Sequence, residues 1–420
     1  MRDKYILTAE SVTEGHPDKL CDTIADAVLD ACLKNDPAAH VACEAMATAG
    51  KIIVAGEITA RELPDIPAIV CRTVREAGYA SDYEVEVITH DQSGDIAGAV
   101  TQDDMGTQPK PSEAGSAGRG GARERTQFSP SGGNGVERTL RRLGAGDQGI
   151  MYGYACGETA ELLPLPVVLA HRLTRLLTNA RRMGTIQGLG PDGKAQISVE
   201  YVFGLPSRIT NVVVSCQHDT DKDMGELRRE ILKSVITPAL RMLPPDEATE
   251  ILINPSGRFV LGGFDADTGL TGRKLMVDTY GGLVPHGGGA LSGKDGTKVD
   301  RSGAYMARYI AKNIVAAGLA EKCTVSLAYA IGRAEPVAVD IDTHQTGEYP
   351  EAVLEQAVRA VFDLTPGGMI HTLGLNRPIF AQFCNYGHFT HQDAPWEQTD
   401  KAGVLVTACE QKCQRAFKEP

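Results

Sequence analysis

The feature that most constrains the fold is a rhythm of helical and strand-like patterns that occurs three times along the 420-residue chain. Each time, a long segment with apolar residues at helical spacing adjoins short segments of alternating apolar and polar residues. No residue-level repeat accompanies this rhythm. Helical patterns cover a segment that begins after residue 19 and residues 66–77, 165–182, 224–240, 302–317 and 351–362, and strand patterns cover 51–59, 83–89, 196–203, 209–216, 250–253, 324–330 and 337–341.

Three such units predict three similar α+β layers, with Ser302 as the cap of one helix and Gly318 as its end. We expect an N-terminal domain over residues 1–99, a central domain over 143–258 and a C-terminal domain over 259–420. Residues 100–142 break the rhythm and are rich in glycine, serine and arginine. A connection of this length predicts a mobile loop, either an active-site lid or a disordered segment.

Composition excludes several classes of protein. A formal net charge of −12 and a pI near 5.4 argue against a nucleic-acid protein, which normally presents a basic face. No apolar run approaches the roughly 18 to 20 residues of a membrane span, and the N-terminus lacks the apolar core of a signal peptide. The ten cysteines form no metal-binding pattern. We therefore expect a cytoplasmic protein with reduced thiols that binds neither nucleic acid nor membrane.

Basic residues and glycines gather in residues 254–300 of this otherwise acidic chain. Glycine lets a backbone approach phosphate oxygens and offer its N–H groups, while lysine supplies a point charge. A flexible surface loop with solvated lysines is the alternative. We predict a site for a small polyanion, whose cations are Arg258, Arg273, Lys274, Lys294 and Lys298.

A second group of functional residue types lies at the expected start of the first helix. Because a helix N-terminus favours anions, His16 and Lys19 are candidate phosphate contacts, and Asp18 is a candidate magnesium ligand. The alternative assigns these side chains to local hydrogen bonding at the helix start. Asp300 is the second candidate ligand, since magnesium on ATP is commonly held by one or two carboxylates. The glycine-flanked acidic turn at 144–149 is a weaker signal.

One further match fails on inspection. Residues 288–294 fit the G-x-x-x-x-G-K pattern of a P-loop, but Asp295 follows where that loop needs serine or threonine for magnesium. The preceding segment is too short for a buried strand and is broken by Pro285. The sequence therefore argues against a P-loop nucleotide hydrolase.

Five segments together resemble the signatures of the S-adenosylmethionine synthase family, also called methionine adenosyltransferases. The resemblance runs from about residue 5 to about residue 402, and its motifs are long and in matching order. It implies an α+β fold of three similar α/β-layered domains in a pseudo-threefold arrangement. The motifs are Gly15-His16-Pro17-Asp18-Lys19, Gly144-Ala145-Gly146-Asp147-Gln148-Gly149, Ile253-Asn254-Pro255-Ser256-Gly257-Arg258-Phe259, Gly269-Leu270-Thr271-Gly272-Arg273-Lys274 and Gly287-Gly288-Gly289-Ala290-Leu291-Ser292-Gly293-Lys294-Asp295.

The same resemblance implies roles for individual residues and partners. It implies two magnesium ions per site, a potassium ion, and two active sites shared across a homodimer that pairs into a dimer of dimers. The implied catalytic residues are His16, Lys194, Arg273, Lys294 and Lys298, and the implied ATP-binding residues are these five with Asp147, Phe259, Lys274 and Ile331. The implied methionine-binding residues are Glu57, Gln92, Asp147, Asp267 and Lys298. The implied metal ligands are Asp18 and Asp300 for magnesium and Glu44 for potassium.

The expected reaction is attack of the methionine sulfur on C5′ of ATP, followed by hydrolysis of the released tripolyphosphate to phosphate and pyrophosphate. Methionine sulfur has no proton to lose, so this chemistry needs no general base. Charge and positioning must instead stabilise the leaving group. Two alternatives remain at this stage: another ATP-using enzyme such as a kinase, and a catalytically inactive regulatory subunit of the same fold.

Overall fold

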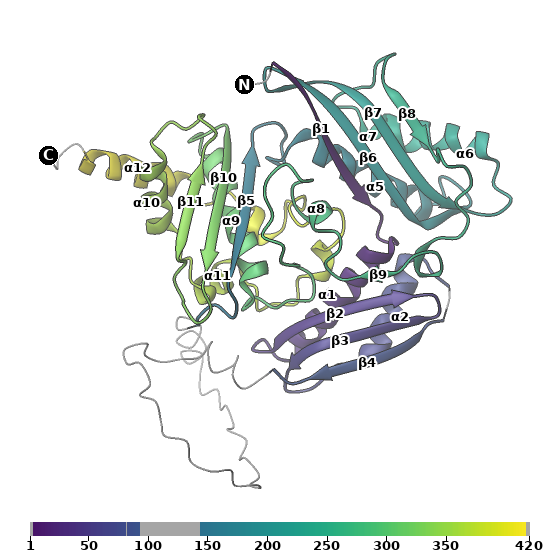
Figure 1. Cartoon of the computed structure of the whole chain (residues 1–420), viewed down its shortest axis with the longest axis horizontal. Helices are drawn as coiled ribbons and strands as arrows, with labels where there is room; N and C mark the ends of the chain where they lie inside the picture. Colours follow the sequence, from purple (N-terminus) through teal and green to yellow (C-terminus); the bar gives the residue numbers. More distant parts are fainter. Residues whose placement is uncertain (1–2, 81, 93–142, 417–420) are drawn as a thin grey trace, which may run out of the picture.

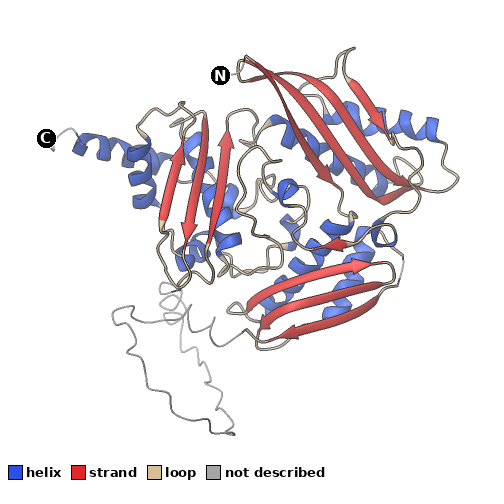
Figure 2. Cartoon of the chain, viewed as in Figure 1, coloured by secondary structure: helices blue, strands red, loops and turns tan. Residues whose placement is uncertain are grey.

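The computed structural model describes residues 3–80, 82–92 and 143–416. Three sheets are each covered by helices on one face, and they surround a central region of loops and short helices (Figures 1 and 2). The predicted mobile loop at 100–142 lies outside the described residues. In the described part of the chain, no helix combines the length and the apolar character needed to cross a bilayer.

The first sheet has the strand order β4-β3-β2-β9, and helices α1 and α2 cover one of its faces. Alternation along β2 explains this arrangement, because Val41, Cys43 and Ala45 are buried against the helices while Glu44 and Met46 are exposed on the open face. The elements are α1 (Pro17–Asn35), β2 (His40–Thr48), β3 (Lys51–Thr59), α2 (Ile66–Ala77), β4 (Glu84–His90) and β9 (Gly269–Leu270).

The second sheet has the order β1-β6-β7-β8 and encloses a separate core with α5 and the helices that follow β7. The helix predicted at 224–240 is divided here, because a π-helical turn lies between two α-helical pieces. The elements are β1 (Lys4–Val12), α5 (Leu165–Arg182), β6 (Leu189–Val202), β7 (Leu205–His218), α6 (Met224–Ile231), η1 (Leu232–Ile236), α7 (Thr237–Ala239) and β8 (Glu250–Ile253).

The third sheet has the order β11-β10-β5, and α9 packs on both β5 and β10. The elements of this layer are β5 (Gly149–Cys156), α9 (Val299–Ala316), β10 (Lys322–Tyr329), β11 (Ala338–Asp342), α10 (Glu351–Val361), α11 (Pro366–Leu373) and α12 (Ala402–Ala416). Short helices elsewhere are η2 (Gly263–Asp265), α8 (Leu275–Asp278), η3 (Ala381–Phe383) and η4 (Pro395–Glu397).

The sheets do not follow chain order. Strand β1, from the start of the chain, pairs with β6; β5 pairs with β10; and β9 returns to pair with β2. The three layers are therefore tied together by strands from distant parts of the sequence (Figure 1). The domain boundaries given above stay a proposal.

The predicted cap of α9 is wrong. The helix begins at Val299 with Lys298 as its N-cap, so Ser302 lies inside its first turn. There the hydroxyl of Ser302 donates to the carbonyl of Lys298 at 3.2 Å, a bond that satisfies a serine within a helix. The earlier start leaves Lys298 and Asp300 at the helix N-terminus.

Acid should destabilise the fold through its buried histidines. Burial, and then the nearby guanidinium of Arg175, lowers the pKa of His171 from 6.5 to about 3. The unfolded chain binds this proton at a higher pH than the folded chain does, so stability falls as pH drops from 6.5 toward 3. We expect His171 to contribute a loss of about 1.4 kcal/mol per pH unit in that window.

Urea denaturation at several pH values below neutrality measures this slope. The His171→Gln variant isolates His171 from other buried groups, such as Asp22, whose pKa burial raises to about 7. The variant should show a flatter dependence of the unfolding free energy on pH. An unchanged slope would remove His171 from the acid sensitivity of the fold.

Candidate active site

His16 stands at the start of α1 with one ring nitrogen engaged and the other without a partner. Its Nδ1 accepts from the backbone N–H of Asp18 at 3.2 Å, which caps the helix as the alternative interpretation predicted. Burial, then the ammonium groups of Lys274 and Lys194, lowers the pKa of His16 to about 3. The ring is therefore neutral, and the proton lies on Nε2, a buried donor with no hydrogen-bond partner in the described structure.

Asp18 faces the basic loop that follows β9. One carboxylate oxygen accepts from the N–H of Leu270 at 3.0 Å, and the other accepts from Nζ of Lys274 at 2.6 Å. Burial alone would raise the pKa of Asp18, but these bonds, that of Lys274 first, hold it below its ordinary value. Asp18 is therefore a charged carboxylate with cations beside it, including Nε of Arg273 at 3.6 Å.

Lys194 joins this group from the second sheet. It is exposed within β6, opposite Val12, the last residue of β1, and the turn after Val12 leads directly to His16. Asp192, two residues earlier, accepts from the N–H of Gly263, and this bond ties the segment that carries Phe259 and Asp267 to the same place. We call this group the first half-site: His16, Asp18, Lys194, Phe259, Asp267, Arg273 and Lys274.

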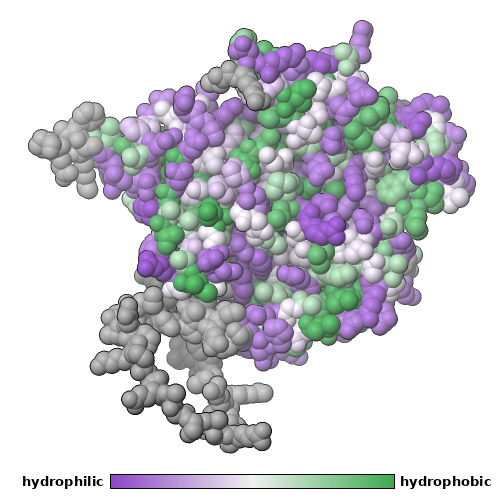
Figure 3. All heavy atoms as spheres, in the orientation of Figure 1, coloured by the Kyte–Doolittle hydropathy of each residue, from purple (hydrophilic) through white to green (hydrophobic). Residues whose placement is uncertain are grey.

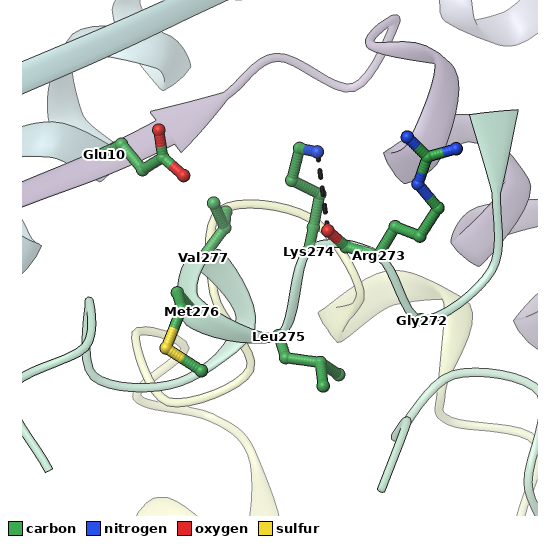
Figure 4. A pocket seen from close by; sticks show the side chains of 7 residues that line it. All are labelled: Glu10, Gly272, Arg273, Lys274, Leu275, Met276 and Val277. Carbon is green, nitrogen blue, oxygen red and sulfur yellow. Dashed lines mark hydrogen bonds between the residues drawn. The ribbon is translucent and has the colours of Figure 1, made fainter. Parts of the chain in front are cut away.

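A cavity of about 290 Å³ lies beside the first half-site. Figure 4 shows Lys274 and Arg273 projecting from the loop between β9 and α8, and Glu10 of β1 on the other side of the opening. Sequence reasoning gave Glu10 no role. The polar position of Glu10 in the alternating pattern of β1 was the available signal, but it needed the unpredicted strand to be recognised.

The other candidate cations lie elsewhere, next to the first sheet. Nζ of Lys294 is 2.5 Å from a carboxylate oxygen of Asp300, and Nζ of Lys298 is 2.7 Å from one of Asp295. The backbone of Lys294 also forms an isolated antiparallel β-bridge with Ala42, at the edge of β2. The sequence analysis gave the side chain of Asp295 no role in the site; in the structure it accepts from the N–H of Val41 and orients Lys298.

The candidate methionine residues of the first sheet lie close to these lysines. Glu57 of β3 is opposite Ala42, so its backbone is two strand spacings, roughly 10 Å, from Lys294. Gln92 follows β4 and donates its N–H to Thr59 of β3. Both therefore belong to the same region of the molecule.

Two turns on the other side of Lys294 complete this group. Gly332 donates to the carbonyl of Ala145, so the turn with Asp147 adjoins the turn with Ile331. Both Asp147 and Ile331 are exposed. A Cβ on Gly149 would lie 3.6 Å from Asp300, which places these turns beside the acidic residue. We call this group the second half-site: Glu57, Gln92, Asp147, Lys294, Lys298, Asp300 and Ile331.

Among the described residues, no hydrogen bond or ion pair joins the two half-sites directly. The predicted basic stretch is therefore divided within one chain, with Arg273 and Lys274 in one half-site and Lys294 and Lys298 in the other. Glu44 lies on the open face of β2, the face that also carries Glu57, because Glu44 pairs with Ala55 and Ala42 pairs with Glu57. The described residues also hold no cluster of three or more side chains of the kinds that bind metal ions.

Two predictions from the sequence can be settled by the geometry. Lys19 does not contact phosphate, because it is 1% exposed and its Nζ is 2.6 Å from Asp278 and 3.1 Å from Asp22. The rejection of a P-loop is confirmed, since no strand of the described structure directly precedes residues 288–294.

Comparison with known proteins gives the family. Models of S-adenosylmethionine synthetase match in three parts: the N-terminal domain over residues 4–98, the central domain over 142–259 and the C-terminal domain over 261–398. An S-adenosylmethionine synthase of Desulforudis audaxviator (strain MP104C) is 48% identical over 415 residues, which cover 96% of this chain and 98% of that protein. The chain belongs to the S-adenosylmethionine synthetase family.

Membership confirms the predicted family, the three-domain α+β fold class and the predicted enzyme activity, synthesis of S-adenosylmethionine. It also makes ATP and methionine the substrates, and the family is generally metal dependent. The roles of single residues, the identity of the ions and the assembly are not given by these matches.

Proposed function

We propose that the chain joins the methionine sulfur to C5′ of ATP, releases tripolyphosphate intact and then hydrolyses it to phosphate and pyrophosphate. The observation that carries this proposal is the environment of His16: a buried, neutral ring whose Nε2–H has no partner, beside Lys194 and Lys274. Such a donor suits the oxygen of the C5′–O5′ bond as that bond breaks. The surrounding cations suit the tripolyphosphate that leaves.

The substrate contacts follow from the half-sites. In the proposal, Phe259 and Ile331 pack on adenine, and Glu57, Gln92 and Asp267 bind methionine. Asp147 contacts both substrates, and Lys298 serves methionine as well as phosphate. The cations that hold the tripolyphosphate, and that serve its later hydrolysis, are Lys194, Arg273, Lys274, Lys294 and Lys298.

Magnesium fits Asp18 and Asp300. Each is a carboxylate with one oxygen bonded to an ammonium group, so each already faces a positive charge. Magnesium on a nucleotide is commonly held by one or two carboxylates together with phosphates and water, so a cluster of three protein ligands is not required. We propose two ions per site, which would offset negative charge on the phosphates. Glu44 is the proposed potassium ligand.

The proposed assembly is a homodimer with shared active sites, which pairs into a dimer of dimers in the cytoplasm. Two observations support the dimer. The open face of the first sheet carries exposed Met46 and Ile88, and Figure 3 shows apolar side chains in the region where β2 and β3 lie in Figure 1. Glu57 and Asp267, both proposed to bind methionine, belong to different half-sites, as expected if one copy supplies each.

Product analysis tests the reaction. Purified protein is given ATP, methionine, magnesium and potassium, and the products are separated by mass spectrometry and phosphate assays. We expect a sulfonium product together with phosphate and pyrophosphate. Formation of ADP would instead indicate a kinase, and no turnover would indicate a regulatory subunit, so either outcome contradicts the proposal.

A further inference from the structure

Four aspartates stand at every fourth position of α1 and bind backbone N–H groups of the loops beside the helix. Residues spaced by four lie on one face, about 6 Å apart along the axis. The segments they hold belong to the two basic loops and to a stretch near the C-terminus. The pairs are Asp18 with Leu270, Asp22 with Gly272, Asp26 with Gly293, and Asp30 with Phe380 and Ala381.

Asp22 fixes the loop that carries Lys274 at both of its ends. Its Oδ1 accepts from the N–H of Gly272 at 2.8 Å. Its Oδ2 is 3.1 Å from the ammonium of Lys19, which also contacts Asp278 at 2.6 Å, four residues beyond Lys274. The three charged side chains are at most 1% exposed, so water cannot replace these contacts.

Asp26 does the same for the loop that carries Lys294. One oxygen accepts from the N–H of Gly293 at 2.7 Å, and both oxygens accept from the guanidinium of Arg301 at 2.6 and 2.8 Å. Arg301 also donates to the carbonyl of Lys294 at 3.0 Å. The peptide units Ser292–Gly293 and Lys294–Asp295 are therefore held by one fully buried ion pair.

The glycines of these loops leave little freedom to find other partners. Gly293 has φ of +80°, and a Cβ there would lie 1.9 Å from the carbonyl oxygen of Cys43. Both loops also bond to the edge of β2, since Thr271 donates to Ala45 and Gly293 accepts from Cys43. Each basic loop is thus clamped between α1 and β2, which lie side by side in Figure 1.

We propose that Asp22 and Asp26 are positioning residues: through backbone bonds they set where Lys274 and Lys294 stand, and so they determine how well the two lysines meet the tripolyphosphate. The inference rests on the proposed function. Burying a carboxylate is unfavourable unless all of its hydrogen bonds are made. Apolar residues packed in the place of a buried ion pair often stabilise a fold equally well. The benefit of these two carboxylates is therefore fixed geometry, and a small displacement of a charge contact lowers the rate steeply.

The test compares Asp26→Asn with Asp30→Asn. In Asp26→Asn the new amide group faces a donor of Arg301, so the side chain loses its charge and one of its two bonds to the guanidinium, and the contact that holds Arg301 and Gly293 together is weakened. Asp30→Asn loses a comparable backbone bond on the same helix, but the segment at Phe380 carries no candidate cation. The measurements are kcat, KM for methionine, the dissociation constant of inorganic tripolyphosphate with magnesium, and the thermal midpoint.

We expect Asp26→Asn to lower kcat about tenfold to a hundredfold and to weaken tripolyphosphate binding about tenfold, with KM for methionine within about twofold. Asp30→Asn should lose similar thermal stability but keep kcat within about threefold of wild type. Equal losses of kcat in both variants, or normal tripolyphosphate binding by folded Asp26→Asn, would overturn the inference.

Arg301→Lys keeps the test decisive if Asp26→Asn does not fold. It retains the charge beside Asp26 but loses the forked contact to the carbonyl of Lys294, so tripolyphosphate binding should again weaken about tenfold. Unweakened binding would count against the inference. Failure of the proposed function would look different, because the wild-type protein would then form no sulfonium product from ATP and methionine.

Discussion

Replacing Lys294 with alanine lowers kcat by about a hundredfold or more while the protein stays folded, because one preorganised charge contact to the leaving tripolyphosphate is worth on the order of 3 kcal/mol. The fold should tolerate the change, since Lys294 and Asp300 are both about one-fifth exposed and water can solvate the carboxylate left behind. Steady-state kinetics with saturating ATP and methionine gives the rate, and circular dichroism reports folding.

Lys222→Ala is the matched control for this experiment. Lys222, which precedes α6, also pairs closely with a carboxylate, that of Glu230 on α6 at 2.7 Å, and its ammonium is paired with no member of either half-site. Its loss should leave kcat within about twofold, as expected for substitutions distant from the chemistry. Near-normal turnover by Lys294→Ala would take that lysine out of the mechanism.

Local patterns predicted most helices because their ends carry local signals. The helix expected at 66–77 is α2, with Asp65 as its side-chain cap and Gly78 in the left-handed conformation after its end. The pattern at 165–182 likewise matches α5. In α2 the periodicity, the cap and the terminator agree, so tertiary contacts reinforce the local preference; α5 has no side-chain cap, and its apolar periodicity is the signal that marks it.

Pairing between distant strands could not be predicted in this way. Strand β1 pairs with β6 across nearly 190 residues, and nothing in the local pattern of residues 4–12 names that partner. The burial of Lys19 between two carboxylates was missed for a related reason. A lysine at a helix start looks like an anion contact until Asp22 and Asp278 are found to enclose it.

The motifs identified the candidate site residues, but not their division into half-sites. Arg273 and Lys294 are only about twenty residues apart and were expected in one basic stretch. Their loops are bonded to different aspartates of α1, the loop of Arg273 to Asp22 and the loop of Lys294 to Asp26. The side chains of Arg273 and Lys294 therefore enter different regions. The four-residue spacing of those aspartates was visible in the sequence. An aspartate on the buried face of a helix is rarely left unpaired, so this spacing was the available signal that each aspartate binds a polar group of a neighbouring segment.

Two inactive variants should restore activity when they share a dimer. One copy carries Lys274→Ala, in the first half-site, and the other carries Lys294→Ala, in the second. If each active site takes its first half-site from one copy and its second from the other, one site of the mixed dimer carries both substitutions and the other carries neither. Coexpression with two affinity tags and sequential purification isolates mixed dimers, whose kcat should be about half that of wild type.

The matched control pairs Lys274→Ala with Lys194→Ala, which both alter the first half-site. Here each of the two sites contains one defect, so the mixed dimer should stay inactive although its assembly is the same. Recovery in this control as well would show that Lys274 and Lys194 come from different copies, and so do not share the first half-site. No recovery in either pair would place a complete active site within one chain, and the half-sites would then have to meet by a movement of the two basic loops relative to α1.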